Sequence, residues 1–261
     1  MNRWASSVLL VLAAACSGAA PAGPVPSDSG AEPADGRFEV SGAVLDLAGT
    51  PVVDVFVTVS TEFCIPDRTD ETGAFAVQEV DPGAKRLITY GETAANGLFA
   101  SAAFAFEADD ALAFDTPVWT PALASWPIDA DAVGEQAVAA EDGLVLTISP
   151  GALTLAPFAP AEVQVARVPI DQAPPFVPDG VELVDLFALG PILSTFDPPA
   201  EVVFPGDTGL QAGASVVFHS LDYDTGLLVV VAHGTVDEAG RPTTADGEGI
   251  PELTWVGVSL E

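Results

Sequence analysis

Residues 38–60 read FEVSGAVLDLAGTPVVDVFVTVS, and this stretch decides the fold of the chain. Residues 38–45 predict one strand, and residues 51–60 predict a second strand after a turn that contains Gly49. Side chains alternate between the two faces of a strand, so the valines of the second run share one face. These valines are Val53, Val55, Val57 and Val59, whereas Asp54, Phe56 and Thr58 lie on the other face.

The same pattern continues along the chain. Short runs rich in Val, Phe, Leu and Thr recur between turns rich in Gly, Pro and Asp, which is typical of a β-sandwich. No long amphipathic helix is predicted, and no apolar run of membrane-spanning length follows the N-terminal segment. We therefore expect an all-β protein with two β-sandwich domains in tandem, over residues 37–122 and 138–261. The acidic stretch between them is expected to be a linker.

The N-terminus is typical of an exported protein. Arg3 supplies a short positive region, and residues 4–15 are apolar but too few to span a bilayer. This segment ends in Leu-Ala-Ala-Ala-Cys at residues 12–16, which resembles the lipobox of bacterial lipoproteins. The alternative is an ordinary secretory signal that is cut after an Ala-x-Ala sequence.

The lipoprotein resemblance implies removal of a signal peptide, residues 1–15, and attachment of a palmitate-containing lipid to Cys16. Ser17 follows the cysteine, and in that family this implies sorting to the outer membrane. Residues 16–36 are dense in Pro, Gly, Ser and Ala and predict a flexible tether behind the lipid.

The first predicted sandwich carries a family resemblance. Its sequence contains G-x-V-x-D-x-x-G-x-P-V, then T-D-E-T-G-x-F-x-V, then V-x-P-G, and resembles the carboxypeptidase regulatory-like domain, a transthyretin-like β-sandwich. That resemblance implies an accessory module without peptidase activity. The matching positions are Gly42, Val44, Asp46, Gly49, Pro51, Val52, residues 69–73, Phe75, Val77, Val80, Pro82 and Gly83.

The second predicted sandwich carries a different family resemblance. Residues 143–153, 189–191 and 196–205 contain G-L-x-L-x-I-x-P-G-A-L, L-G-P and F-x-x-P-x-x-V-x-F-P. They resemble the β-sandwich of netrin receptors, tight-junction scaffolds and ankyrins. The resemblance implies a structural or protein-binding module and carries no catalytic residue.

The charge of the chain excludes some partners. It has 38 acidic and 7 basic residues and a formal net charge of −31. A nucleic-acid-binding protein needs a basic surface to neutralise phosphates, so nucleic acid is not expected as a partner. Docking of the folded part on anionic lipid is disfavoured for the same reason.

Scarce residue types argue against common enzyme sites. The chain has two histidines, two cysteines and one lysine, and contains neither H-E-x-x-H nor C-x-x-C. Lys85 is followed by Arg86, so no P-loop is present, and the G-x-S-x-G elbow of many esterases is also absent. We therefore expect no enzyme and no cofactor, although a pair of carboxylates among so many acids is left open.

One candidate metal site lies in a predicted hairpin. Apolar runs flank residues 222–226, where Asp222 and Asp224 have the D-x-D spacing of a calcium loop. The alternative, which we favour, is a turn stabilised by an aspartate side chain. His219 should oppose Val229 or Val230 across the hairpin, which leaves it too far from His233 for both to bind one metal.

Two tryptophans form a candidate ligand platform. Trp119 and Trp126 lie in a Pro-containing segment and could stack on a sugar, but they could equally fill the space between two domains. Cys64 lies between Phe63 and Ile65, so we expect it to be a buried small side chain rather than a thiol for another chain.

Together these features predict a non-catalytic, lipid-anchored protein of the cell envelope, in the outer membrane, that binds an envelope protein or glycan or acts as a spacer. One alternative is a calcium-dependent carbohydrate-binding or adhesion protein. Another is a hydrolase that uses carboxylates.

Overall fold

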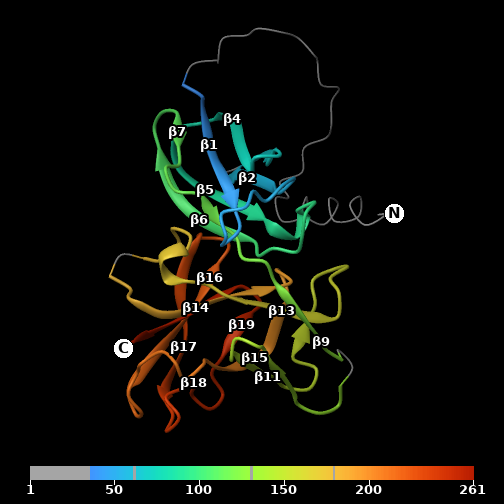
Figure 1. The fold of residues 1–261 in the computed structure, drawn as a ribbon, viewed down its shortest axis with the longest axis vertical. Helices are drawn as coiled ribbons and strands as arrows, with labels where there is room; N and C mark the ends of the chain where they lie inside the picture. Colours follow the sequence, from blue (N-terminus) through green and yellow to red (C-terminus); the bar gives the residue numbers. More distant parts are fainter. Residues whose placement is uncertain (1–35, 61–62, 130–131, 179) are drawn as a thin grey trace.

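The computed structural model describes residues 36–60, 63–129, 132–178 and 180–261, and nearly all of their regular elements are β-strands. The exceptions in these ranges are two short 3-10 helices, η1 (Gly91–Thr93) and η2 (Ile170–Gln172). The predicted all-β class is confirmed. None of the described helices is long and apolar enough to cross a bilayer. Figure 1 shows the first half of the described chain stacked above the second half.

The first half forms two small sheets that enclose one core. In one sheet the order is β4–β1–β7, with β8 also paired to β1; in the other it is β3–β2–β5–β6. Strand β1 is antiparallel to β4 and parallel to β7 and β8. The bounds are β1 Phe38–Leu45, β2 Phe56–Ser60, β3 Cys64–Arg68, β4 Ala74–Val80, β5 Gly83–Tyr90, β6 Ala102–Ala108, β7 Leu112–Ala113 and β8 Val118–Trp119.

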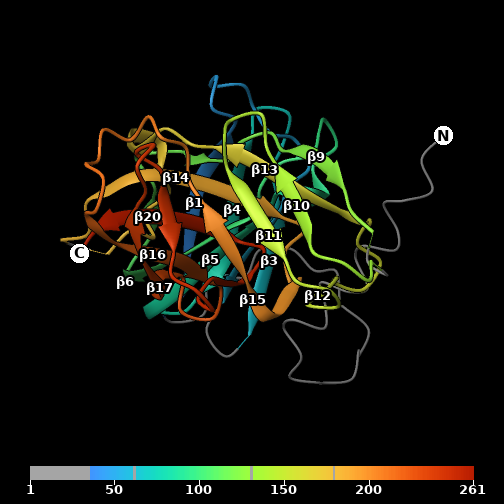
Figure 2. The same ribbon diagram turned by 90° about the horizontal axis from the view of Figure 1, so that it is seen from below.

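The second half forms one long sheet in the order β10–β11–β15–β18–β17–β16–β20–β14–β13–β9, and β12 and β19 also pair with β15. Seen from below in Figure 2, this sheet curls from β20 and β14 on one side to β11 and β10 on the other. The bounds are β9 Ala124–Pro127, β10 Gln136–Ala139, β11 Val145–Ile148, β12 Leu153–Thr154, β13 Glu162–Arg167, β14 Leu183–Gly190, β15 Thr195–Val203, β16 Ser215–Asp222, β17 Leu227–Val236, β18 Pro242–Thr244, β19 Ile250–Glu252 and β20 Trp255–Leu260.

The predicted strand over residues 51–60 is shorter in the structure, where β2 begins at Phe56. Asp54 has a positive φ of 61°, which is incompatible with an extended strand and reverses the alternation before it. Val52 is therefore buried in place of Val53, whereas the three later valines are buried as predicted.

The segment between the two predicted sandwiches is not a plain linker. Strand β9 pairs antiparallel with β13, and β10 pairs antiparallel with β11, so both join the long sheet. Trp126 of β9 lies opposite Val163 of β13 and packs against the core of the second half. The strands of the second half thus begin before residue 138.

The core of the first half continues into the second half. Phe104 and Leu87 belong to the same buried cluster as Phe176, Leu186 and Trp255. The rings of Phe176 and Trp255 meet edge to face with centroids 5.1 Å apart, an arrangement that stabilises aromatic pairs. A separate cluster fills the interior of the second half. The two sandwiches therefore share a desolvated apolar contact.

Candidate functional site

A groove of about 540 Å³ lies on the outer face of the long sheet, beside the segment that leads into β14. His219 of β16 and Ser259 of β20 both line it, and His219 Nε2 lies 2.9 Å from Ser259 Oγ. The two side chains share a face because Ser259 is paired with Val217, two residues before His219. Apolar side chains, including Leu183 and Val230, complete the lining.

The surroundings of Ser259 differ from those of an activated serine nucleophile. Burial lowers the pKa of His219, so the imidazole is neutral at neutral pH and can share a hydrogen bond with Ser259. A serine nucleophile also needs backbone amides aimed at a developing oxyanion. Strand β20 lies between β14 and β16, and Ser259 is paired with Leu183 on one side and Val217 on the other. Its surroundings are those of a central strand, whose amides are used by the sheet.

The structure places Asp222 and Asp224 at the tip of the β16–β17 hairpin. The Oδ1 atom of Asp222 accepts the backbone N–H of Asp224 at 2.7 Å and that of Thr225 at 3.3 Å, which is the geometry of an aspartate-stabilised turn. Within the described residues, no group of three or more His, Cys, Asp or Glu side chains is arranged to hold a metal.

The hairpin tip instead contacts the first sandwich. Arg86 of β5 donates a hydrogen bond to the backbone carbonyl of Asp224 and lies 3.8 Å from its carboxylate. Gly226 approaches the backbone of β6 so closely that an added Cβ would lie 2.7 Å from Ala105 N and from the carbonyl carbon of Phe104. The expected hairpin thus serves as an interdomain contact.

The two histidines lie apart, as expected. His219 opposes Val230 in the hairpin register, and His233 opposes Val217. His233 is exposed, and its Nδ1 atom lies 3.4 Å from Glu248 Oε2.

Trp119 and Trp126 belong to strands of different sheets. Trp119 is in β8, which pairs with β1, whereas Trp126 is in β9 of the long sheet. Both side chains are half-buried.

Cys16, the predicted signal peptide and nearly all of the predicted tether lie outside the described residues. Cys64 begins β3, is half-buried and is disulfide-bonded, which corrects the expectation of a buried thiol.

A group of five residues connects the two sandwiches, and no sequence pattern pointed to it. We call it the Glu92 cluster; its members are Glu92, Ser101, Ile192, Tyr223 and Trp255. Ser101 Oγ donates to Glu92 Oε2 at 2.6 Å, and the backbone N–H of Ile192 donates to Glu92 Oε1 at 3.1 Å. The carbonyl oxygen of Ser101 accepts the Tyr223 hydroxyl at 2.9 Å and the Trp255 indole N–H at 2.5 Å. Glu92 and Ser101 belong to the first sandwich and the other three to the second.

The Glu92 cluster lies in a strongly desolvated place. The Glu92 residue keeps some exposure, but its carboxyl end is surrounded by protein atoms. Burial raises the pKa of Glu92, and the hydrogen bonds from Ser101 and Ile192 only partly offset this effect. Burial also holds the pKa of the Tyr223 hydroxyl well above its usual value.

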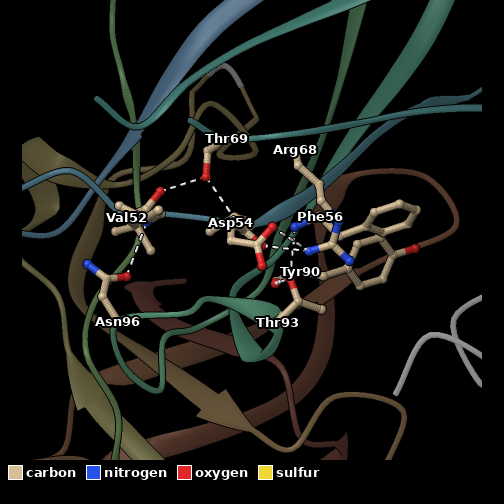
Figure 3. A network of polar contacts seen from close by, with 10 residues as sticks. Val52, Asp54, Phe56, Arg68, Thr69, Tyr90, Thr93 and Asn96 are labelled. Carbon is tan, nitrogen blue, oxygen red and sulfur yellow. Dashed lines mark hydrogen bonds and ion pairs between the residues drawn. The ribbon is translucent and has the colours of Figure 1, made fainter. Parts of the chain in front are cut away.

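A second polar network shapes the first sandwich (Figure 3). Thr69 Oγ1 donates to the carbonyl of Val52 at 2.7 Å and accepts the N–H of Val55 at 2.9 Å. Asn96 exchanges two hydrogen bonds with the same segment, and Arg68 Nη1 lies 2.9 Å from Asp54 Oδ1. These contacts satisfy the backbone where the strand is interrupted, so their role is structural.

A third network joins β13 to β14 and to a loop. Arg167 Nε donates to the buried Asp185 at 2.9 Å, and its two terminal nitrogens each lie 2.8 Å from an oxygen of Asp207. Burial raises the pKa of Asp185 although Arg167 acts in the opposite direction. The guanidinium keeps an otherwise costly buried carboxyl group paired.

No protein-family model matches the chain, and no curated protein matches it in sequence. The resemblances to a regulatory-like domain and to the netrin-receptor sandwich therefore stay predictions.

Some solved structures resemble the chain weakly. A DUF3823 family protein from Parabacteroides merdae covers 86% of this chain and 98% of its own, with 9% identity and a TM-score of 0.26. A proposed carbohydrate-binding protein from Bacteroides uniformis covers 85% of this chain and 79% of its own, with 7% identity and a TM-score of 0.25. The major pilin subunit of Bacillus cereus covers 86% and 95%, with 10% identity and a TM-score of 0.27. Likenesses this weak carry no information about function.

Proposed function

We propose that this chain is a non-catalytic, lipid-anchored protein of the cell envelope, in which two β-sandwiches act as one rigid body. The observation that carries the proposal is the contact between the sandwiches. It combines a shared apolar cluster with hydrogen bonds between residues 100 to 154 positions apart. A spacer or a presenting module benefits from such rigidity, because a flexible joint would let the binding surface of one sandwich move relative to the other.

The anchor is proposed from the N-terminal sequence. Arg3, the apolar segment and Cys16 have the order of a lipoprotein signal, and a tether rich in Pro, Gly and Ser follows. One acyl chain holds a protein only weakly to a bilayer, so a stable anchor requires more than one chain on the modified cysteine. Ser17 favours the outer membrane as the destination.

The anchor is tested by metabolic labelling with a palmitate analogue in cells that express the full chain. We expect labelling of the wild type and of Cys64→Ala, and no labelling of Cys16→Ala. A thioether-linked lipid on Cys16 would leave the disulfide of Cys64 to a cysteine of another chain, because Cys16 and Cys64 are the two cysteines of this chain. An unlabelled wild type whose peptide map contains a Cys16–Cys64 disulfide would refute the anchor.

The partner is proposed to be an envelope protein or a glycan bound on the folded part. The groove beside His219 and Ser259 is the place where we expect it, because an apolar lining with a few hydrogen-bonding groups is typical of binding sites. Crosslinking in intact envelopes, with the tether retained, tests this by comparing the wild type with Val230→Asp. Val230 lines the groove and is 53% exposed, so its exchange should spare the fold and reduce the crosslinked product.

A further inference from the structure

The Glu92 carboxyl group is an acid placed where two sandwiches meet. Its oxygens accept one hydrogen bond from each side of the contact: Ser101 lies in the same sandwich, and Ile192 lies in the other. Ser101 in turn presents its carbonyl oxygen to Tyr223 and Trp255 of the second sandwich. One titratable group is thus linked to three separate segments across the interface.

No cation compensates the ionised form of this group among the described ion pairs, none of which includes Glu92. The carboxyl group instead accepts hydrogen bonds from neutral donors, which are the Ser101 hydroxyl and the backbone N–H groups of Ile192 and of Glu92 itself. A buried carboxylate without a cation is unfavourable, whereas a neutral carboxylic acid keeps a carbonyl oxygen for the Ile192 amide. We propose that proton uptake by Glu92 controls how tightly the two sandwiches are held together.

Burial of Glu92 determines the direction in which pH changes the strength of the contact. Desolvation raises the pKa of Glu92 above its ordinary value of 4.5 when the interface is closed, whereas an open interface returns the group to water. The closed form therefore binds the proton more tightly than the open form. The contact is strongest at and below pH 4.5 and weakens as the pH rises through the raised pKa.

The neighbouring titratable groups set the controls. Tyr90 at the end of β5 and Tyr223 directly after β16 both interact with Glu92, and burial raises the pKa of each hydroxyl, so both stay neutral in this range. The guanidinium of Arg86 interacts with Tyr90. Glu252 of β19 interacts with Tyr223, and its own pKa is raised, first by burial and then by Asp222 and Asp224. Its titration must therefore be separated from that of Glu92.

The test is hydrogen exchange of the Ile192 backbone amide in the full folded chain at pH 5 and pH 8, corrected for the intrinsic exchange rate. One unit of pKa difference between closed and open forms corresponds to about a tenfold change in opening. Because the exposed group is already partly ionised at pH 5, that unit amounts to about a threefold change between pH 5 and pH 8. We expect the wild type to show about threefold or more opening at pH 8 relative to pH 5, and Glu92→Gln to show less than about twofold. Amides of the β1–β4 ladder should show no such dependence in either protein.

Two controls accompany this measurement. Glu252→Gln removes a carboxyl group near the interface, and Glu107→Gln removes one on β6. Both variants should keep the wild-type pH dependence of exchange at Ile192. Ser101→Ala removes one donor to the carboxylate, so it should move the midpoint of opening to higher pH. If Glu92→Gln does not fold, this shift of the midpoint in Ser101→Ala still tests the proposal.

A wild-type amide whose corrected exchange is equal at both pH values would overturn the proposal. So would a pH dependence that persists in Glu92→Gln, or a midpoint that Ser101→Ala leaves in place. The proposal rests on the rigid pairing of the sandwiches and not on the lipid anchor, so the labelling experiment at Cys16 and this one fail independently.

Discussion

Replacing Gly226 by alanine tests whether the two sandwiches touch as closely as the structure indicates. Gly226 lies at the tip of the β16–β17 hairpin with a positive φ of 70°. An added Cβ would lie 2.7 Å from two backbone atoms of the first sandwich and 2.9 Å from a third. Backbone of a paired strand cannot turn aside as a flexible side chain does, so the sandwiches would have to separate by at least about 0.7 Å.

The expected loss of stability combines backbone strain at positive φ with overpacking against the first sandwich. Substitution of a second glycine measures the backbone strain alone. Gly151 has nearly the same φ, 71°, but nothing lies within 4 Å of its added Cβ. Left-handed backbone costs a non-glycine residue about 1 kcal/mol, and this applies at both positions. Overpacking typically adds about 1–3 kcal/mol, and this applies only at Gly226. We therefore expect about 1 kcal/mol for Gly151→Ala and about 2–4 kcal/mol for Gly226→Ala.

The assay is urea unfolding followed by tryptophan fluorescence, with thermal melting as a second measurement. For a chain of this size, about 1 kcal/mol corresponds to a change in Tm of about 2–4 °C. Gly151→Ala should lower Tm by about that amount, and Gly226→Ala by ~5–15 °C. Equal losses for the two substitutions would show that no close contact exists at Gly226, and the rigid pairing would have to be abandoned.

Three further predictions concern charge. Arg167→Ala should lower the free energy of unfolding at pH 7 by about 2–4 kcal/mol, because it leaves the buried Asp185 unpaired. Arg241→Ala at an exposed pair should lower it far less. Urea unfolding measures both changes, and similar values would refute the reasoning. Because burial lowers the pKa of His219, the folded state binds this proton less tightly than the unfolded state, so the contribution of His219 to stability falls as the pH drops below 6.5, opposite in sign to the contribution of Glu92. In melting curves between pH 4.5 and 7.5, the Tm of His219→Gln should therefore rise relative to that of the wild type as the pH falls, with His233→Gln as the matched exposed-histidine control. Millimolar calcium, followed by a chelator, should leave Tm unchanged, because a ligand that binds only the folded state must raise it; a reversible rise would restore the calcium-loop hypothesis.

The sequence predicted most strands because their signals are local. Alternating valines mark β2, and apolar runs on both sides of an Asp- and Gly-containing turn mark the β16–β17 hairpin. The position of the turn predicted His219 opposite Val229 or Val230, and the structure pairs it with Val230. The error at residues 51–55 arose because Asp54 takes a positive φ, which few residues other than glycine do and which no periodicity reveals.

The candidate site was less predictable. The aspartates of the hairpin were correctly located in a turn, but their contact with Arg86 joins residues 138 positions apart. Glu92 and Ser101 are an ordinary glutamate and serine in a stretch without strong patterning. Burial alone makes that glutamate unusual, and burial depends on how the second sandwich packs.

The sequence by itself determined the all-β class and many of the turns, because alternation and turn residues act within a few neighbouring residues, whereas the exported N-terminus stays a prediction. Tertiary structure alone decided which strands share a sheet, that β9 and β10 join the second half, and that Glu92, Tyr223 and Trp255 meet at one interface. The hydrogen bonds of Tyr223 and Trp255 to Ser101 join residues more than 100 positions apart along the chain. Their free energy comes from desolvation and packing, which exist only after both sandwiches have formed.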